Sequence, residues 1–245
     1  MSERAVVIGG TSGIGLAAAE RLLGLGYEVV VGGRGVERLD SALRQLKGHD
    51  GGGAGATGRI VDAADEEQLA EFFAAVGPFD HLVVTVSAVG GVFSLLDVTA
   101  EELRRHSEGK LIPHLLTVKA ALGTLRADGS VTLLGAVSSQ LSAPGLVVLG
   151  SVNAAVETAA RVLAAELAPR RVNAVSPGVI DTPWWDWVPA EARADTLAGA
   201  CASTPLGRPG RPEEVADAIC FLVGNGYTTG VVLPVDGGAR LGPVR

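Results

Sequence analysis

The sequence contains little of what proteins need in oxidising or membrane environments. Among its 245 residues there are only two cysteines, Cys201 and Cys220, which are far apart. A disulfide framework is therefore not expected, and a reducing cytoplasm is the expected location. The first apolar run, residues 5–10, is too short for a signal peptide, and no apolar stretch is expected to reach the length of a membrane span.

Basic residues are outnumbered by acidic ones, and histidine is scarce. The chain has 20 basic and 27 acidic residues and a net charge of −7, so no basic surface for DNA or RNA stands out. The four histidines have no spacing that suggests a metal site. The expected partner is a small molecule, with no nucleic acid, membrane or metal.

The chain does contain a regular alternation of apolar and amphipathic segments, which predicts a single α/β domain over residues 1–245. Strands are expected at 5–8, 29–31, 59–61, 82–86, 130–134, 172–175 and 231–235, and helices at 14–25, 35–47, 65–76, 110–127, 150–168 and 213–223. Several strands lack polar alternation, as is typical when both faces of a sheet are covered. This order indicates a doubly wound, mainly parallel sheet. The glycine-rich residues 48–58 are interpreted as a surface loop.

The strongest motif is GGTSGIG at residues 9–15, directly after the first expected strand and at the start of a helix. In this context Gly9 permits a tight turn, Gly13 lets the backbone approach a phosphate, and Gly15 lets the helix pack close to the sheet. The free N–H groups of the helix N-terminus would then face a pyrophosphate. The motif predicts a dinucleotide site, and an ordinary tight turn is the alternative.

The end of the second expected strand indicates which dinucleotide is bound. Gly33 stands where an acid usually binds the unphosphorylated ribose, and Arg34 follows it. Because a guanidinium suits a 2′-phosphate, NADP(H) is favoured over NAD(H). The alternative is that Arg34 is only a solvated charge at a helix start.

Taken together, the motifs resemble those of the short-chain dehydrogenase/reductase family over essentially the whole chain. The matching stretches are GGTSGIG, Asp62-Ala63, RVNAVSPGVIDTP at 171–183, PLGRPGRPEEVADAICFLV at 205–223 and TGVVLPVDGG at 229–238. The resemblance implies a seven-stranded Rossmann-type sheet with a substrate-loop insertion at about 183–210. It also implies a homo-oligomer, dimer or tetramer, built on the helices at 110–127 and 150–168. The cofactor would be lined by Gly9, Thr11, Ser12, Gly13, Ile14, Gly15, Gly33, Arg34, Asp62, Ala63, Ser87, Pro177, Gly178, Ile180 and Thr182.

The chain departs from this family at all four positions of its catalytic tetrad. Counting back from the helix at 150–168, Leu149 occupies the tyrosine position and Asn153 the lysine position. Ala136 occupies the serine position, with Ser138 close by, and Lys110 occupies the asparagine position. Since leucine cannot donate a proton, the usual proton transfer through a phenol is not available at this position.

Lysine and asparagine have thus exchanged places, which makes Lys110, with Asn153 or Ser138, the candidate catalytic group. A lysine beside a bound cofactor can act as a donor, base or cation, or stabilise an oxyanion. The alternative is a helix lysine that points at solvent or at a phosphate. A helix break at Pro113 would help to aim Lys110 inward.

All three tryptophans lie in WWDWV at 184–188, just after Thr182. Trp184, Trp185 and Trp187 could clamp an apolar or aromatic substrate or close a dry lid. Equally, they could simply pack the loop against the body.

Three functions follow as hypotheses. The first is an atypical NADP(H)-dependent oxidoreductase that acts on a carbonyl, alcohol or activated alkene. The second is a catalytically silent NADP(H)-binding sensor or scaffold, and the third is a non-redox isomerase, dehydratase or cyclase on the same fold.

Overall fold

The computed structural model describes residues 2–48, 55–202 and 204–242, and its centre is one parallel sheet. The strands are β1 (Arg4–Ile8), β2 (Glu28–Gly33), β3 (Ala56–Ile60), β4 (Phe79–Val84), β5 (Leu125–Leu134), β6 (Arg171–Pro177) and β7 (Val232–Val235). They lie side by side in the order β3-β2-β1-β4-β5-β6-β7, with every neighbouring pair parallel. The seven-stranded doubly wound sheet that the sequence predicts is therefore confirmed.

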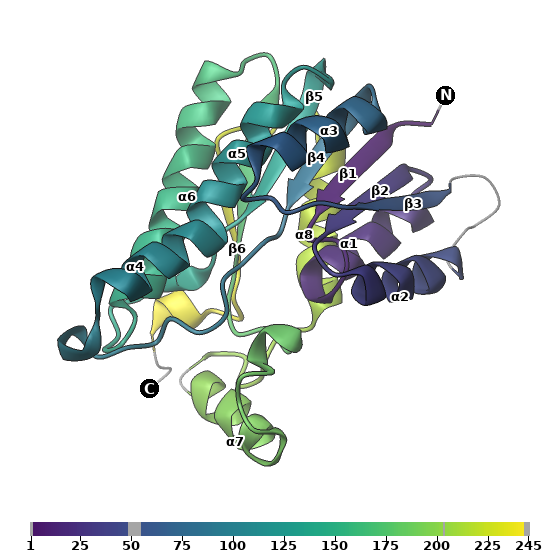
Figure 1. Cartoon of the computed structure of the whole chain (residues 1–245). Coiled ribbons are helices and arrows are strands. Elements are labelled where there is room, and N and C mark those ends of the chain that lie inside the picture. Colours follow the sequence, from purple (N-terminus) through teal and green to yellow (C-terminus); the bar gives the residue numbers. More distant parts are fainter. Residues whose placement is uncertain (1, 49–54, 203, 243–245) are drawn as a thin grey trace.

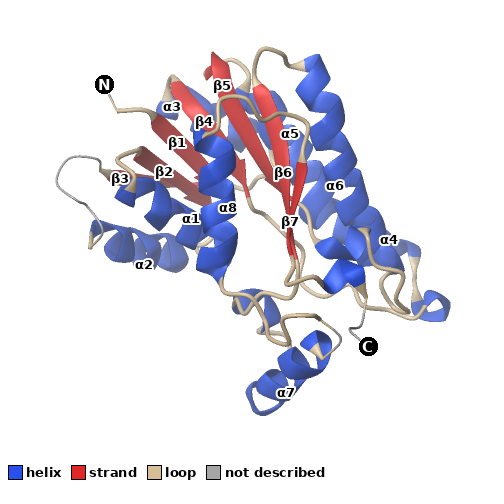
Figure 2. Ribbon diagram, turned by 180° about the vertical axis from the view of Figure 1, so that it is seen from behind, coloured by secondary structure: helices blue, strands red, loops and turns tan. Residues whose placement is uncertain are grey.

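Helices cover both faces of this sheet, as Figures 1 and 2 show from opposite sides. One face carries α1 (Gly13–Gly24), α2 (Val36–Lys47) and α8 (Pro212–Gly224), and the other carries α3 (Glu66–Val76), α5 (Ile112–Ala121) and α6 (Val147–Glu166). Short α4 (Ala100–His106) precedes α5, and α7 (Ala190–Cys201) projects from the body beyond the carboxyl ends of the strands.

The strands divide their side chains between two cores. In β1, Val6 and Ile8 join the core under α3, α5 and α6, whereas Ala5 and Val7 join the core under α1, α2 and α8. All four are essentially inaccessible to solvent. This explains why the strands read as continuous apolar runs, because neither face of the sheet needs a polar residue.

Several sequence expectations about helices need correction. The helix expected over 110–127 ends at Ala121, because β5 already begins at Leu125, and helices α4 and α7 were not predicted. Of the glycine-rich tract 48–58, residues 56–58 belong to β3, and residues 49–54 lie outside the described residues.

The expectation that no stretch could span a membrane is wrong on length and composition, since α6 passes that test. In the fold, α6 buries Val148, Val156 and Ala160. Val156 and Ala160 belong to the core under this face of the sheet, which is an ordinary reason for a helix to be apolar.

Parallel strands bring all their carboxyl ends to one edge of the sheet. The chain reverses its winding direction between β1 and β4, because β2 and β3 lie on one side of β1 and β4 to β7 lie on the other. Ligands of open α/β sheets bind outside the strand ends at such a point. The candidate site therefore lies where β1 and β4 end.

Candidate active site

The turn from β1 into α1 is packed so tightly that Gly9 and Gly15 have no room for a side chain. Gly9 has φ +87°, in the left-handed region that favours glycine. A Cβ on Gly15 would lie 2.3 Å from the carbonyl oxygen of Gly9 and 2.4 Å from Oγ1 of Thr85. Since Thr85 directly follows β4, Gly15 allows α1 to begin against both central strands.

No acidic or capping side chain occupies the first turn of α1, so its backbone N–H groups can bind an anion. Its N-cap residue Ser12 makes no side-chain capping bond, and no acidic residue lies in the first turn. By contrast, α3 is capped by Asp65, whose carboxylate accepts hydrogen bonds from the backbone N–H groups of Glu67 and Gln68. The N-terminal amides and the positive end of the α1 dipole are thus available to a phosphate.

The second strand end supplies a positive charge. Arg34 lies just past β2, is exposed, and pairs with Asp62 at 3.9 Å between Nη1 and Oδ2. Its neighbour Gly33 packs on Thr11, since a Cβ there would lie 2.7 Å from Cγ2 of Thr11. Asp62 also accepts the N–H of Ala64, and Ala63 is buried. These residues form a charged rim beside the α1 turn.

The stretch that follows β6 closes on the same turn from the other side. A Cβ on Gly13 would meet Cβ of Thr182 at 3.4 Å, so the two segments are in contact. Ile180 is buried and bridges to Gly210. The expected cofactor residues all lie at or beyond the carboxyl ends of strands: after β1 (Gly9, Thr11, Ser12, Gly13, Ile14, Gly15), from the end of β2 (Gly33, Arg34), after β3 (Asp62, Ala63), after β4 (Ser87), and from the end of β6 (Pro177, Gly178, Ile180, Thr182). We call this set the nucleotide half.

The helix is not interrupted near Pro113 as expected, but continues through one π-helical turn. Residues Ser107–Leu111 form a π-helix between α4 and α5, with Pro113 in the first turn of α5. Such an extra residue in a helix often occurs at functional sites. The π-turn directs Lys110 inward, where only 5% of the residue is exposed.

Lys110 is a buried cation. Its Nζ donates to the carbonyl oxygen of Gly135 at 3.1 Å, just past the end of β5. Burial lowers the pKa of Lys110 to about 8, although the charge of Glu157 acts in the opposite direction. His114, on the next turn, donates a hydrogen bond from Nδ1 to the carbonyl oxygen of Lys110, 2.8 Å away. Because a carbonyl only accepts, Nδ1 of His114 carries the proton, and burial lowers its pKa to about 3.

Glu157 is a further buried acidic residue, and no sequence motif pointed to it. Its two carboxylate oxygens accept hydrogen bonds from Ser176 at 2.6 Å and from Ser139 at 2.7 Å. It packs so closely on Gly135 that a Cβ there would lie 2.7 Å from its Oε1. Glu157 thereby ties α6 to the ends of β5 and β6.

The residues at the expected tetrad positions meet around the start of α6. Nδ2 of Asn153 donates to Oγ of Ser138 at 3.0 Å and to the carbonyl oxygen of Leu149 at 2.9 Å. Oδ1 of Asn153 is buried and has no partner among the described residues. Ala136 lies two residues before Ser138. We call Lys110, the segment 135–139, Leu149 and Asn153 the reaction half.

Both tyrosines of the chain lie away from this region. Tyr27 precedes β2, at the opposite edge of the sheet, and packs on His81 with ring centroids 5.5 Å apart. Tyr227 follows α8 and is fully exposed. Neither phenol can reach the reaction half in this arrangement.

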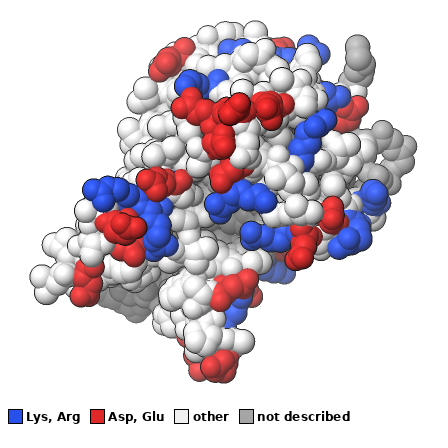
Figure 3. Space-filling view, viewed as in Figure 1, with Lys and Arg blue, Asp and Glu red and all other residues white. Residues whose placement is uncertain are grey.

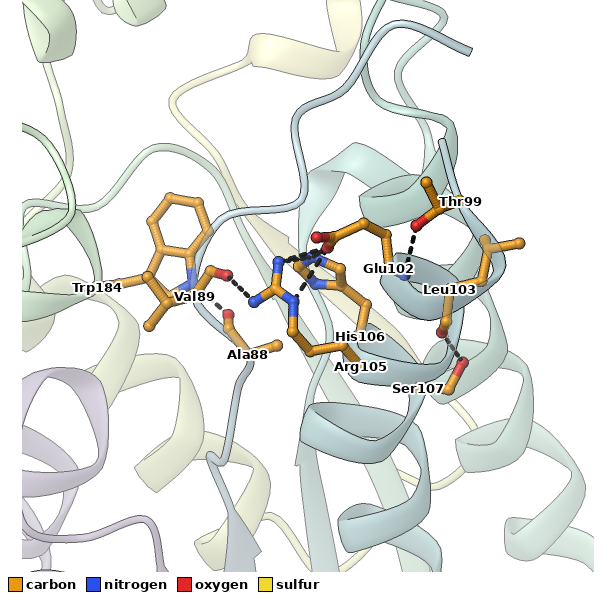
Figure 4. Close-up of polar contacts among 9 residues, drawn as sticks. All are labelled: Ala88, Val89, Thr99, Glu102, Leu103, Arg105, His106, Ser107 and Trp184. Carbon is orange, nitrogen blue, oxygen red and sulfur yellow. Dashed lines mark hydrogen bonds and ion pairs between the residues drawn. The ribbon is translucent and has the colours of Figure 1, made fainter. Parts of the chain in front are cut away.

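The tryptophans form one cluster that is attached to the loop after β4. Trp184 lies edge-on to Trp185 at 4.9 Å and to Trp187 at 6.1 Å. Its indole Nε1 donates to the carbonyl oxygen of Ala88 at 2.7 Å, as Figure 4 shows. Arg193 from α7 holds the loop by bonds to Asp181 and Asp186. The loop is thus anchored beside the reaction half.

A histidine that the sequence analysis left unassigned lies in the same place. His106, at the end of α4, is 2% exposed, and Arg105 donates from Nη2 to its Nε2 at 3.0 Å (Figure 4). A Cβ on Gly91 would lie 2.8 Å from Cε1 of His106 and 2.9 Å from Cγ of Leu149. The sequence does place His106 four residues before Lys110, but this spacing is informative only once α4 is known to be a helix.

Comparison with known proteins gives one consistent result. Residues 9–240 match the family described as enoyl-(acyl carrier protein) reductase. The chain is 34% identical to the short-chain dehydrogenase/reductase ATR9 of Stachybotrys chlorohalonatus, over 96% of each chain.

Two solved structures are informative. One is the NADPH-bound structure of a short-chain oxidoreductase from Pseudomonas aeruginosa PAO1, described as containing an atypical catalytic center, with 32% identity, a TM-score of 0.88 and coverage of 97% of this chain and 98% of that one. The other is the MalC reductase/Diels-Alderase of Malbranchea aurantiaca, with 27% identity, a TM-score of 0.89 and coverage of 98% and 97%.

Proposed function

This chain belongs to the short-chain dehydrogenase/reductase family, and we propose that it is an NADP(H)-dependent oxidoreductase with a rewired proton-transfer site. Its substrate is a carbonyl compound or the corresponding alcohol, or an activated alkene. The observation that carries this proposal is the contact between Gly13 and Thr182. It closes both sides of a nucleotide half whose residues match the family, beside a reaction half that has lost the family's phenol.

The residues present fit NADP(H). The uncapped first turn of α1 suits the pyrophosphate, and exposed Arg34 suits a 2′-phosphate. The orphaned Oδ1 of Asn153 can accept a hydrogen bond from a ribose hydroxyl, which would satisfy a buried acceptor that now costs free energy. When bound, the reduced cofactor supplies the hydride that adds to the electrophilic carbon. The relatives support this choice, since the P. aeruginosa oxidoreductase is NADPH-bound.

Lys110 supplies positive potential under the reacting atoms. A charged Nζ in a dry interior acts over a longer range than in water, so it favours negative charge that develops on a substrate oxygen nearby. Ser138, held by Asn153, adds a hydroxyl at the loop that replaces the family's serine. Lys110, Asn153 and Ser138 thus form the proposed catalytic centre.

The substrate is proposed to be apolar or aromatic, because the tryptophan cluster is anchored beside the reaction half. Acidic and basic side chains are interspersed on the face in Figure 3, so we propose a small molecule and not a nucleic acid or membrane as partner. The proposed state is a cytoplasmic homo-oligomer, dimer or tetramer. Exposed apolar residues on α5 and α6 would support it, among them Ile112, Leu115, Val147 and Val162.

The deciding experiment is a titration with NADPH and NADH, followed by a carbonyl screen on the wild type and Lys110→Met. NADPH should bind more tightly than NADH, and its absorbance should decay in stopped flow with a good substrate. Full turnover by Lys110→Met would remove Lys110 from the proposed centre. Tight NADPH binding with no turnover of any carbonyl would contradict the proposal in favour of a silent binding module.

The second candidate function is a non-redox cyclisation or isomerisation in the same site. The similarity to the MalC reductase/Diels-Alderase favours it, because that protein has 27% identity and nearly full coverage. Product formation without any change in the redox state of the cofactor would establish this function. Strict one-to-one consumption of NADPH with product would exclude it.

A further inference from the structure

The ammonium group of Lys110 has few partners for a charge inside the fold. Only 5% of the residue is exposed, and among the described residues Nζ has a single hydrogen-bond acceptor, the carbonyl oxygen of Gly135. An ammonium group can donate three hydrogen bonds, and burying a charge is costly unless other groups compensate for it. A second compensating group is therefore expected nearby.

Glu157 is the acidic residue in that position. It is 4% exposed, and a Cβ on Gly135 would lie 2.7 Å from its Oε1 and 2.8 Å from its Cγ. Lys110 donates to the carbonyl oxygen of the same glycine at 3.1 Å, so both charged groups lie beside Gly135. The negative charge of Glu157 raises the pKa of Lys110, against the larger effect of burial.

Two serines hold the carboxylate of Glu157 in place. Ser176 of β6 donates to Oε1 at 2.6 Å, and Ser139, in the turn after β5, donates to Oε2 at 2.7 Å. Both oxygens therefore act as acceptors, as in an ionised carboxylate. Because the hydroxyl groups carry no charge, they fix the carboxylate without neutralising its attraction for Lys110.

The same face of α6 also holds the loop that carries Ser138. Asn153 and Glu157 lie one helical turn apart and bind the successive residues Ser138 and Ser139. Near the start of α6, a Cβ on Gly150 would lie 2.8 Å from the carbonyl oxygen of Ser138, so the helix and the loop are in close contact. Glu157 is thus the point at which the loop is joined to the surroundings of Lys110.

We propose that Glu157 is a positioning residue for the proposed reduction. Its fixed carboxylate keeps Lys110 charged at the end of β5 and, through Ser139, keeps Ser138 in place. The inference rests on the proposed function, which assigns the charge of Lys110 to the stabilisation of a substrate oxygen. Glu157 itself takes no part in hydride or proton transfer.

The contribution of Glu157 decides the charge of Lys110 at neutral pH. With a pKa of about 8, roughly nine in ten Lys110 side chains are charged at pH 7, whereas a pKa one unit lower would leave about half charged. A modest electrostatic effect therefore has a large consequence for the reaction half.

The other titratable groups around Lys110 are neutral or point to solvent. Burial lowers the pKa of His114, on α5, to about 3. At the end of α4, burial and the charge of Arg105 lower the pKa of His106. Glu108, in the π-turn, is exposed. None of these groups can replace the buried carboxylate.

The first test measures the charge of Lys110 directly. The chain has only three lysines, and Lys47 and Lys119 are exposed, so carbon-13 labelling of lysine Cε gives few signals, which Lys110→Met assigns. In the wild type without added nucleotide, the Lys110 signal should titrate near pH 8. In Glu157→Gln, which keeps the shape of the side chain but removes its charge, the midpoint should fall by about one pH unit.

Two further variants separate charge from shape. Glu157→Asp keeps the charge but draws it back, so the midpoint should fall by less than in Glu157→Gln. Glu166→Gln removes the same charge from the exposed end of α6 and should leave the midpoint unchanged. A Lys110 midpoint at or above the wild-type value in either Glu157 variant overturns the proposal, so one folded variant is enough.

The pH profile of turnover is the second readout. With NADPH and phenanthrenequinone, wild-type kcat should fall as the pH rises through about 8, because the charge of Lys110 is lost. In Glu157→Gln the fall should begin one unit lower, so kcat should be about fivefold below wild type at pH 8 and nearly equal at pH 6. An equal loss at every pH would indicate a purely structural role and overturn the proposal. Absence of turnover in the wild type would instead overturn the proposed function, since the lysine titration needs no substrate.

Discussion

The nucleotide half is shaped mainly by backbone packing, whereas the reaction half is made of interacting side chains. In the nucleotide half, backbone segments approach each other closely, and glycines such as Gly9 and Gly15 are needed because a Cβ at either position would collide with Thr85. In the reaction half, the side chains of Lys110 and Asn153 are held by hydrogen bonds to Gly135 and Ser138. Glu157, which packs on Gly135, is held by Ser139 and Ser176. A site formed by the backbone tolerates few substitutions, because they alter its shape. A site formed by side chains can accept different residues if each new charged group has a partner.

The largest expected effect lies in the nucleotide half. Gly15→Val would place side-chain atoms where Gly9 and Thr85 already lie, so it should cost about 3 kcal/mol of unfolding free energy and abolish measurable NADPH binding. Gly24→Ala, at the other end of α1, is the control, because a Cβ there meets nothing within 4 Å. Thermal unfolding and an NADPH titration measure both. Equal stability of the two variants would contradict the close packing.

The next prediction tests whether burying the charge of Lys110 lowers the free energy of unfolding, a cost that the nucleotide half does not have. Because its folded pKa is about 8 and its unfolded pKa is 10.5, Lys110 binds fewer protons when folded between these values, and stability should rise with pH there. Lys110→Met should remove this rise and be more stable near pH 7, by up to about 3 kcal/mol before its lost bond to Gly135 is counted. Glu157 and His114 are the other titratable groups beside it.

Denaturant unfolding between pH 7 and pH 10 provides the measurement. Lys119→Met is the matched control, since Lys119 lies on α5 but is exposed and pairs with Glu66 at the surface. The control should keep the rise in stability with pH. If Lys110→Met keeps it too, Lys110 is not the buried titrating group.

A third variant sharpens the specificity of the nucleotide half. Arg34→Ala should weaken NADPH binding by about 10-fold to 100-fold, as expected for the loss of charged hydrogen bonds, and leave NADH binding nearly unchanged. Arg44→Ala removes the same charge from the far end of α2 and should change neither affinity by much. Equal losses for both nucleotides would show that Arg34 supports the loop rather than the 2′-phosphate.

More of the nucleotide half than of the reaction half can be predicted from the sequence, because backbone turns are local and side-chain partners come from distant elements. The alternation of runs predicts the sheet, and the glycines of 9–15 predict the turn, because both are local backbone demands. Glu157 and His106 were missed because their roles depend on what other elements bring to them. Glu157 matters only when the turn after β5 and strand β6 present Ser139 and Ser176, and His106 only when α4 ends beside Leu149.

The smallest expected effect concerns the link between the tryptophan loop and the segment after β4. Trp184→Phe removes the donor to Ala88 but keeps an aromatic surface, so it should cost about 1 kcal/mol at the closed loop and raise KM for an aromatic ketone about fivefold. Trp187→Phe is the control, because Trp187 is half exposed. Steady-state kinetics with kcat and KM separated provide the test. If KM rises equally in both variants, then the aromatic surface alone matters, and the bond to Ala88 does not position the loop.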